Sequence, residues 1–379
     1  MNASARPRGS LLSRRRIGTA IASCARDALD LRRIGALLAL FALTACATLE
    51  QPRAEGTLEP VFGTQSFLTP DGYRLPYDRH GPQRPRAVVV ALHGFTEHRG
   101  VHRRLGEALA EHDIAVYAYD QRGFGETRYR GIWPGIDALK RDARTTLALV
   151  QARYPDRPVH LLGESMGGAV AMLATADDAG APTPESLILL APAVWGREGM
   201  PWYQRSALWV GELLTPGLRF NPVEVRRIAD IQPTNDPEVI AEMQTDERML
   251  REVRTDMLVG MTDLMDGARA ATDVLGDDTL ILYGLEDEII PPEATCSLLR
   301  RIEARERPWP TVAIYPDGYH LLTRDLQRHR VLGDIVAWIE GRAGRLPSGN
   351  DQPVAVARHQ VCATIPAPPK RITIPPGGP

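Results

Sequence analysis

The chain has 379 residues, of which 44% are hydrophobic and 24% charged, and its 45 basic and 47 acidic side chains give a net charge of −2. These proportions are ordinary for a soluble globular protein and argue against collagen, a coiled coil, a polytopic membrane protein or a wholly disordered chain. The near-neutral charge lacks the basic excess of a nucleic-acid-binding protein, and four cysteines are too few to build a disulfide scaffold.

The N-terminal segment has the pattern of an export signal. Residues 1–33 carry eight arginines, an apolar run follows at 34–43, and small residues lead to Cys46. This is the pattern of a secretory signal, and the apolar run is shorter than the roughly 20 residues that a membrane-spanning helix needs. The run Leu43-Thr44-Ala45-Cys46 resembles the bacterial lipobox, which implies a signal peptide at 1–45 and a lipid-anchored Cys46 in the bacterial cell envelope. An ordinary signal peptide with an incidental cysteine is the alternative.

The predicted cleavage before Cys46 changes the charge and the cysteine count of the mature chain. It removes eight basic and two acidic residues, which leaves a net charge of −8. Ala47, rather than an aspartate, follows the anchor and favours sorting to the outer membrane, facing the periplasm. Cys24 is removed and Cys46 carries the lipid, so that Cys296 and Cys362 are expected to remain as thiols.

From residue 58 onward, apolar runs alternate with amphipathic stretches. Residues 58–79 are predicted to form a hairpin whose turn is Thr69-Pro70-Asp71-Gly72. Continuous apolar runs are typical of strands buried on both faces of a parallel sheet. Such runs occur at 87–92, 114–119, 159–162, 187–190, 280–283 and 312–315, with amphipathic stretches at 105–111, 136–154 and 167–176. This alternation predicts an α/β fold with a mostly parallel, doubly wound sheet.

Residues 193–271 interrupt the alternation, because their pattern is helical and contains no strand-like run. Such an insertion predicts a helical cap in the second half of the fold. Trp202 and Trp209 lie seven residues apart on one helical face, where they either contact a lipid acyl chain or only attach the cap to the sheet. The proline-rich C-terminal residues predict a disordered tail. The chain thus divides into a signal peptide (1–45), a linker after the lipidated cysteine (46–57), a core in two parts (58–192 and 272–345), the cap between them (193–271) and the tail (346–379).

A strand, a sharp turn and a helix surround the motif Gly163-Glu164-Ser165-Met166-Gly167. In this context Gly-x-Ser-x-Gly is a nucleophile elbow. Its glycines are needed because the turn is strained and the strand and helix pass too close for a β-carbon. The turn holds the Ser165 hydroxyl above the sheet at the start of a helix, whose amides favour developing negative charge. Ser165 is therefore the predicted nucleophile.

A serine nucleophile needs a base and a group that orients the base. In folds with this elbow, the acid and then the histidine follow the serine along the chain. The histidines after Ser165 are His320, His329 and His359. His320 lies in a loop just past an apolar strand and is the predicted base, whereas His329 lies among charged residues and His359 in the predicted tail.

The predicted acid is Asp287, in a loop of three carboxylates that follows the strand at 280–283. Glu286 is the alternative, because spacing alone does not select among adjacent carboxylates. Asp317 is too close in sequence to His320 to orient its imidazole easily.

The developing oxyanion needs two donors. One is expected to be the amide of Met166, directly after the nucleophile. The other is expected to be the amide of Phe95, in the loop after the strand at 87–92. His93 in the same loop precedes the serine, and together with Gly94 it is interpreted as a structural turn rather than as a base.

Five sequence blocks resemble the monoacylglycerol lipase and lysophospholipase family of α/β-hydrolases, which is also classed with serine-aminopeptidase-like hydrolases. They are His93-Gly-Phe-Thr-Glu-His98, Asp120-Gln-Arg-Gly-Phe-Gly125, Gly163-Glu-Ser-Met-Gly-Gly168, Gly284-Leu-Glu-Asp287 and Gly318-Tyr-His320-Leu-Leu, within residues 60–343. The resemblance implies an α/β-hydrolase fold, with Ser165, Asp287 and His320 as a catalytic triad and Phe95 and Met166 as oxyanion amides. Two departures are Thr96, where the family often has glycine, and Phe124, where histidine is frequent.

The same resemblance implies a serine hydrolase that cleaves carboxylic esters, in monoacylglycerols or lysophospholipids, through an acyl-enzyme. A serine aminopeptidase or amidase is one alternative, and it needs an acidic pocket for the substrate's amino group. The cap acids that would have to supply this pocket are Glu198, Glu212, Asp246 and Asp263. A non-catalytic envelope lipoprotein is the other alternative. No metal-ligand spacing, dinucleotide fingerprint or phosphate loop is present, so no metal or other cofactor is expected, and the oligomeric state is left open.

Overall fold

The computed structural model describes residues 49, 51–52, 56–176, 180–222, 224, 231–341 and 344–366. The predicted signal peptide 1–45, the predicted lipidation site Cys46 and the last residues of the predicted tail, 367–379, lie outside the described residues. In the part of the chain that is described, no helix has the length and apolar character needed to cross a membrane.

The core of the described chain is a ten-stranded sheet in the order β1-β2-β3-β5-β4-β6-β7-β10-β11-β12. The strands are β1 (Val61–Phe62), β2 (Ser66–Leu68), β3 (Arg74–His80), β4 (Ala87–Leu92), β5 (Ile114–Tyr119), β6 (Val159–Glu164), β7 (Leu187–Leu190), β10 (Thr279–Gly284), β11 (Thr311–Tyr315) and β12 (Asp351–Gln352). Strands β5, β4, β6, β7, β10 and β11 run parallel, and antiparallel strands flank them at both edges. The predicted mostly parallel α/β sheet is confirmed.

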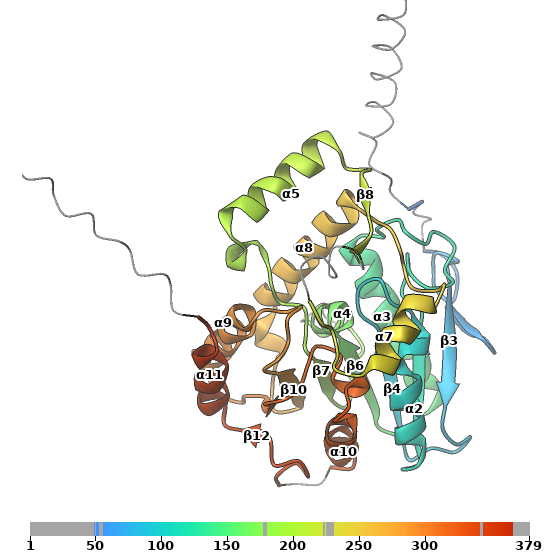
Figure 1. The fold of residues 1–379 in the computed structure, drawn as a ribbon. Helices are drawn as coiled ribbons and strands as arrows, with labels where there is room; N and C mark the ends of the chain where they lie inside the picture. Colours follow the sequence, from blue (N-terminus) through green and yellow to red (C-terminus); the bar gives the residue numbers. More distant parts are fainter. Residues whose placement is uncertain are drawn as a thin grey trace, which may run out of the picture.

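Helices cover both faces of this sheet (Figure 1). Successive residues of β4 point to opposite faces, so that Val88 and Val90 belong to one hydrophobic cluster and Val89 and Ala91 to another. The first cluster includes side chains of α3 (Ile136–Arg153), α4 (Met166–Thr175) and α9 (Pro292–Glu303). The second includes side chains of α2 (Arg103–Ala110) and α10 (Arg328–Ile339). A continuously apolar strand such as β4 is therefore buried on both faces of the sheet, as its composition requires.

The predicted hairpin is present as β2 and β3, which pair antiparallel. In its turn, the amide of Gly72 donates to the carbonyl of Thr69 at 2.8 Å. Gly72 has a φ of +75°, a conformation that glycine adopts without steric cost. The turn residues thus account for the register of the pair.

The segment predicted as a cap contains α5 (Trp202–Leu214), α7 (Pro237–Thr245), α8 (Thr255–Ala270) and the paired short strands β8 (Arg219–Phe220) and β9 (Val253–Arg254). Helix α5 projects at one end of the molecule, contacts α8 and has no buried residue (Figure 1). Trp202 and Trp209 are 72% and 63% exposed, so neither attaches the cap to the sheet. By contrast, α8 packs against α3 and α4 in the layer that covers the sheet. The β8–β9 pair and the core position of α8 both differ from the sequence expectation.

Residues 346–366 are folded, which corrects the prediction of a disordered tail for this part of the chain. Strand β12 pairs with β11, and α11 (Val354–Ala363) packs against α9. A disulfide joins Cys296 of α9 to Cys362 of α11, so the expectation that both remain thiols is wrong. The proline content indicated disorder, whereas Val354, Ala357 and Val361 are spaced to share one helical face and are buried.

Candidate active site

The predicted nucleophile elbow lies between β6 and α4. Ser165 adopts a φ of +54° and a ψ of −116°, which is a strained conformation for a residue with a side chain. A β-carbon on Gly163 would lie 2.3 Å from the Gly167 carbonyl oxygen, and one on Gly167 would lie 2.2 Å from the Leu92 carbonyl oxygen. Both glycines are therefore required by close backbone approach, as expected. Ser165 stands directly before Met166, the first residue of α4, whose amides have no acceptor within the helix.

His320 and Asp287 are in contact at the ends of two neighbouring strands, β11 and β10. The His320 Nδ1 lies 2.8 Å from the Asp287 Oδ2, and both residues are buried. The other carboxylate oxygen of Asp287 accepts the amides of Ile289 at 2.8 Å and Ile290 at 2.9 Å. A proton held on Nδ1 by Asp287 leaves Nε2 of His320 free to act as a base.

The other two candidate acids lie elsewhere. Glu286 and Asp317 are exposed, and Asp287 is the carboxylate that contacts His320. The two loops also touch through their backbones, because a β-carbon on Gly284 would lie 2.1 Å from the Gly318 carbonyl oxygen, which accepts the Glu286 amide at 2.9 Å. This packing turns the side chain of Asp287 inward and that of Glu286 outward, a distinction that spacing alone did not make.

Charged neighbours raise the pKa of His320. Burial by itself lowers the pKa of this imidazole, but the carboxylates of Asp287, Glu164 and Glu97 outweigh burial, so that the pKa lies above 6.5. His320 thus accepts a proton more readily than a free histidine.

The loop after β4 packs against the elbow. A β-carbon on Gly94 would lie 3.4 Å from the Ser165 β-carbon, and the next residue, Phe95, lines the same cavity as Ser165. Thr96 has a φ of +68°, a conformation that costs a β-branched residue about 1–3 kcal/mol. This left-handed conformation explains why glycine suits the position and why threonine is a departure.

His93 has a structural set of contacts. One ring nitrogen, Nε2, accepts the Gln121 amide at 3.0 Å, and Nδ1 lies 2.8 Å from the Gly94 carbonyl oxygen. Burial lowers the pKa of this imidazole. His93 therefore joins the ends of β4 and β5, in agreement with its interpretation as a turn residue.

The other two histidines that follow Ser165 along the chain lie away from these groups. His329 is exposed in the first turn of α10, and His359 lies on α11 rather than in a disordered segment. Neither lines the cavity that contains Ser165.

A buried cluster of three charged residues was not anticipated from the sequence. Arg324 pairs with Glu97 at 2.8 Å and with Glu164 at 2.9 Å. The only sequence signal was that Glu97 and Glu164 lie within the motif blocks and that Arg324 follows the last block by two residues. Nothing in the local pattern indicated that they meet.

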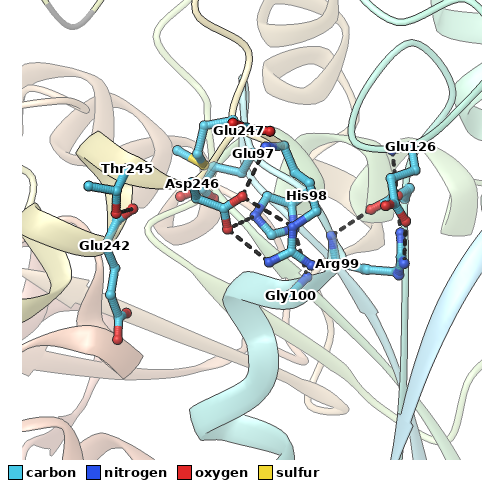
Figure 2. A network of polar contacts seen from close by, with 12 residues as sticks. Glu97, His98, Arg99, Gly100, Glu126, Glu242, Thr245, Asp246 and Glu247 are labelled. Atoms are coloured by element: carbon cyan, nitrogen blue, oxygen red, sulfur yellow. Dashed lines mark hydrogen bonds and ion pairs between the residues drawn. The ribbon is translucent and has the colours of Figure 1, made fainter.

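Polar contacts connect the cap to the loop after β4 (Figure 2). His98 Nε2 lies 2.9 Å from the Asp246 Oδ2, and Asp246 also pairs with Arg248. Nearby, the Leu250 amide donates to the Thr96 carbonyl at 2.8 Å. The position of the cap segment after α7 is therefore coupled to the backbone beside Phe95.

Ser165 and His320 line one cavity together with residues of the segment predicted as a cap. Its other described lining consists of Gly94, Phe95, Thr96, Glu97, Pro222, Pro233, Met243, Ile289 and Leu321. Apart from Glu97, which is paired with Arg324, this lining carries no charged side chain among the described residues. Across the whole described part of the chain, no group of three or more histidine, cysteine or acidic side chains is arranged to hold a metal ion.

Comparisons with known proteins agree with this architecture. Residues 83–327 match the model of the family described as serine aminopeptidase, S33. The chain is 27% identical over 280 residues to the monoacylglycerol lipase of Mycolicibacterium smegmatis, covering 72% of this chain and 95% of that protein. It is 26% identical over 264 residues to the monoglyceride lipase of Homo sapiens, covering 68% and 84%.

Solved structures of other proteins identify the fold class. The crystal structure of Paleococcus ferrophilus monoacylglycerol lipase superposes with a TM-score of 0.58 at 20% identity, covering 71% of this chain and 99% of that chain. A carboxyl esterase from Bacillus coagulans superposes with the same TM-score at 20% identity, covering 75% and 98%. The fold is accordingly that of the α/β-hydrolases.

Proposed function

The chain belongs to the serine aminopeptidase S33 family of hydrolases, and we propose that it cleaves the carboxylic ester of a monoacylglycerol or a lysophospholipid through a Ser-His-Asp triad. One observation carries the proposal. Ser165, on a strained elbow, shares a mainly apolar cavity with His320, whose Nδ1 contacts Asp287 at 2.8 Å. The relatives named as monoacylglycerol or monoglyceride lipases support the ester substrate.

In the proposed reaction, Ser165 Oγ attacks the ester carbonyl carbon while His320 Nε2 takes its proton. The amides of Phe95 and Met166 receive the oxyanion, and Asp287 stabilises the imidazolium. The intermediate then collapses, the alcohol leaves with the proton from His320, and the acyl group remains on Ser165. Water, deprotonated by His320, attacks this acyl-enzyme and releases the fatty acid.

The cavity supports an ester substrate over an aminopeptidase substrate. A free amino group would require an unpaired carboxylate in the cavity. Three of the four acids named in the predicted cap form ion pairs: Glu198 with Arg269, Asp246 with Arg248 and Asp263 with Arg197. The fourth, Glu212, is exposed on α5. The apolar lining suits an acyl chain.

A substrate panel tests the proposal. We expect purified protein to hydrolyse monoacylglycerols, lysophospholipids or p-nitrophenyl esters, and Ser165→Ala to abolish this activity. His320→Ala should be inactive, whereas the matched control His329→Ala should keep wild-type activity. Turnover of aminoacyl-nitroanilides without turnover of any ester would overturn the ester assignment. A wild-type protein that a fluorophosphonate fails to label at Ser165 would instead support a non-catalytic lipoprotein.

We also propose that a lipid on Cys46 anchors the enzyme in the bacterial envelope, at the outer membrane facing the periplasm. The Cys296–Cys362 disulfide supports export, because disulfides persist in oxidising compartments. The exposed Trp202 and Trp209 also suit a protein that works beside lipid, since tryptophan favours membrane interfaces. Cys46→Ala should move the protein from the membrane fraction to the soluble fraction of the expressing bacterium. Unchanged partitioning would exclude the anchor.

A further inference from the structure

Three of the four loops that carry the proposed catalytic groups, those of Phe95, Ser165 and His320, meet at the buried cluster formed by Arg324, Glu97 and Glu164. The Nη2 of Arg324 lies 2.8 Å from the Glu97 Oε1 and 2.9 Å from the Glu164 Oε1. The side chain of Arg324 is only 4% exposed, and those of the two glutamates are buried as completely. One guanidinium thus joins two carboxylates in the interior.

Each member of the cluster is attached to one part of the proposed catalytic apparatus. Glu164 is the last residue of β6 and directly precedes Ser165. Arg324 ends a short 3₁₀ helix, Leu322–Arg324, that follows His320. Glu97 also accepts the Gly94 amide on its second oxygen, at 3.0 Å, and so shapes the turn that presents the Phe95 amide.

The cluster is an expensive way to fill a core. Taking ions out of water is unfavourable, and apolar side chains of similar volume often stabilise a fold as well or better. The Oε2 of Glu164 has no hydrogen-bond partner among the described residues, so the contact of Arg324 with Oε1 is what offsets the burial of this carboxylate. A site that is costly to bury and that touches these three loops is better explained by their alignment than by stability alone.

We propose that Arg324 is a positioning residue, which holds the Phe95 loop, the Ser165 elbow and the His320 loop in catalytic alignment through Glu97 and Glu164. This inference rests on the proposed function, because it assigns Arg324 a role in the same site. Displacing reacting groups by about 1 Å can cost 10²-fold in rate.

The charges around the cluster give a second consequence. His320 is faced by Asp287, Glu164 and Glu97. The other titratable groups that face the cluster are His93 and His102 beside Glu97, and Asp325 beside Arg324 and His320. Replacing Glu164 by glutamine removes one negative charge near His320, so the pKa of His320 should fall.

The chain contains a matched control for Arg324. Arg122 also joins two carboxylates, Asp71 and Asp142, and its side chain is 5% exposed. It lies on the turn after β5 and contacts neither the elbow nor the His320 loop through these pairs. Substitutions at Arg122 therefore measure the general cost of breaking a buried arginine cluster.

The experiment compares Arg324→Met, Arg324→Lys and Arg122→Met on a short p-nitrophenyl ester, below the melting temperature of each variant. We expect Arg324→Met to lower kcat about 10²-fold with KM nearly unchanged, and Arg324→Lys to recover part of the loss. Arg122→Met should lower the melting temperature but keep kcat. Wild-type kcat in Arg324→Met, or an equal loss of kcat in Arg122→Met, would overturn the proposal.

Two further readouts keep the test decisive. Glu164→Gln, which is isosteric, should move the acid limb of the kcat/KM profile to lower pH, and an unmoved limb would count against the cluster. The rate at which a fluorophosphonate labels Ser165 needs no known substrate. If no ester is turned over but labelling still slows in Arg324→Lys, the proposed function fails and the role of Arg324 stands. Equal labelling rates in wild type and Arg324→Lys would overturn that role, whatever the substrate.

Discussion

Asp287 is held by its own loop as well as by the imidazole that it contacts. Its Oδ1 accepts the amides of Ile289 and Ile290, while its Oδ2 faces His320. Because the two oxygens have different partners, the carboxylate cannot rotate without losing hydrogen bonds. The tautomer and orientation of His320 therefore depend on this one side chain.

Replacing Asp287 by asparagine should lower kcat about 10³- to 10⁴-fold, because the amide supports the wrong tautomer and cannot stabilise the imidazolium. Steady-state kinetics on a soluble ester measure the loss. Glu286→Gln and Asp317→Asn are the controls, since both carboxylates are exposed, and each should keep kcat within about twofold. A severe loss in Glu286→Gln with an active Asp287→Asn would reassign the acid.

The pH dependence of the wild type follows from the carboxylates around His320. The proposed base, His320, must be neutral to take the serine proton, and its pKa lies above 6.5. The acid limb of kcat/KM reports the pKa of the base in the free enzyme. Activity should therefore rise with pH through a midpoint above 6.5, measured on an ester whose own hydrolysis is corrected for. A midpoint clearly below 6.5 would contradict the charge environment described for His320.

At the scale of elements, α11 is joined to the rest of the fold both through the strand that precedes it and through the helix that it packs against. Its buried residues pack on α9, the Cys296–Cys362 disulfide joins the same two helices, and β12 pairs the preceding segment with β11. Cross-linking residues 66 apart in sequence reduces the entropy of the unfolded chain. The C-terminal helix is thus part of the core and contributes to its stability.

Reduction of this disulfide should lower the stability of the protein by about 2–4 kcal/mol. Urea unfolding with and without dithiothreitol measures the change, and Cys362→Ser should show the lowered stability in both conditions. Thiol titration of the unfolded, unreduced protein lacking the predicted signal should detect no Cys296 or Cys362 thiol. Insensitivity of the wild type to the reductant would contradict the cross-link.

At the scale of the whole molecule, several buried titratable groups make stability depend on pH. Burial lowers the pKa of His102 to about 3 and that of His160 to about 4. The unfolded chain binds these protons near pH 6.5, so the fold loses stability as the pH falls from about 6.5 toward these values. Asp142 acts in the opposite direction, because burial raises its pKa to about 6 and the folded state then binds the proton first.

His102→Leu isolates one of these contributions. Between about pH 6 and 4 the unfolding free energy of the wild type should fall more steeply than that of the variant, by up to about 1.4 kcal/mol per pH unit. Urea titrations at several pH values give both slopes. Parallel slopes would show that His102 does not titrate on unfolding in this range. His112→Leu is the control, because that side chain is partly exposed.

Local sequence patterns predicted the parts of this molecule whose causes are local. The apolar runs at 87–92, 114–119 and 187–190 coincide with β4, β5 and β7, because a strand buried on both faces must be continuously apolar. The elbow glycines were also predictable, because the close backbone approach that requires them lies within the turn and its neighbouring strand and helix.

Features that depend on contacts between distant residues were not predictable in this way. Arg324 lies 160 residues from Glu164, and an arginine in a polar loop has the local pattern of a solvated side chain. The choice of Asp287 over Glu286 depends on how the β10 loop packs on the β11 loop, and α11 depends on a partner helix that a proline-rich composition does not reveal.

The backbone contact between Gly284 and Gly318 restricts how the proposed active site can be redesigned. With a β-carbon excluded at Gly284, the loops of Asp287 and His320 have no layer of side chains between them that could absorb a displacement. An inserted residue or a graft from another hydrolase in one loop therefore shifts the other. The two loops have to be exchanged together, as a single module, if the spacing of Asp287 and His320 is to survive.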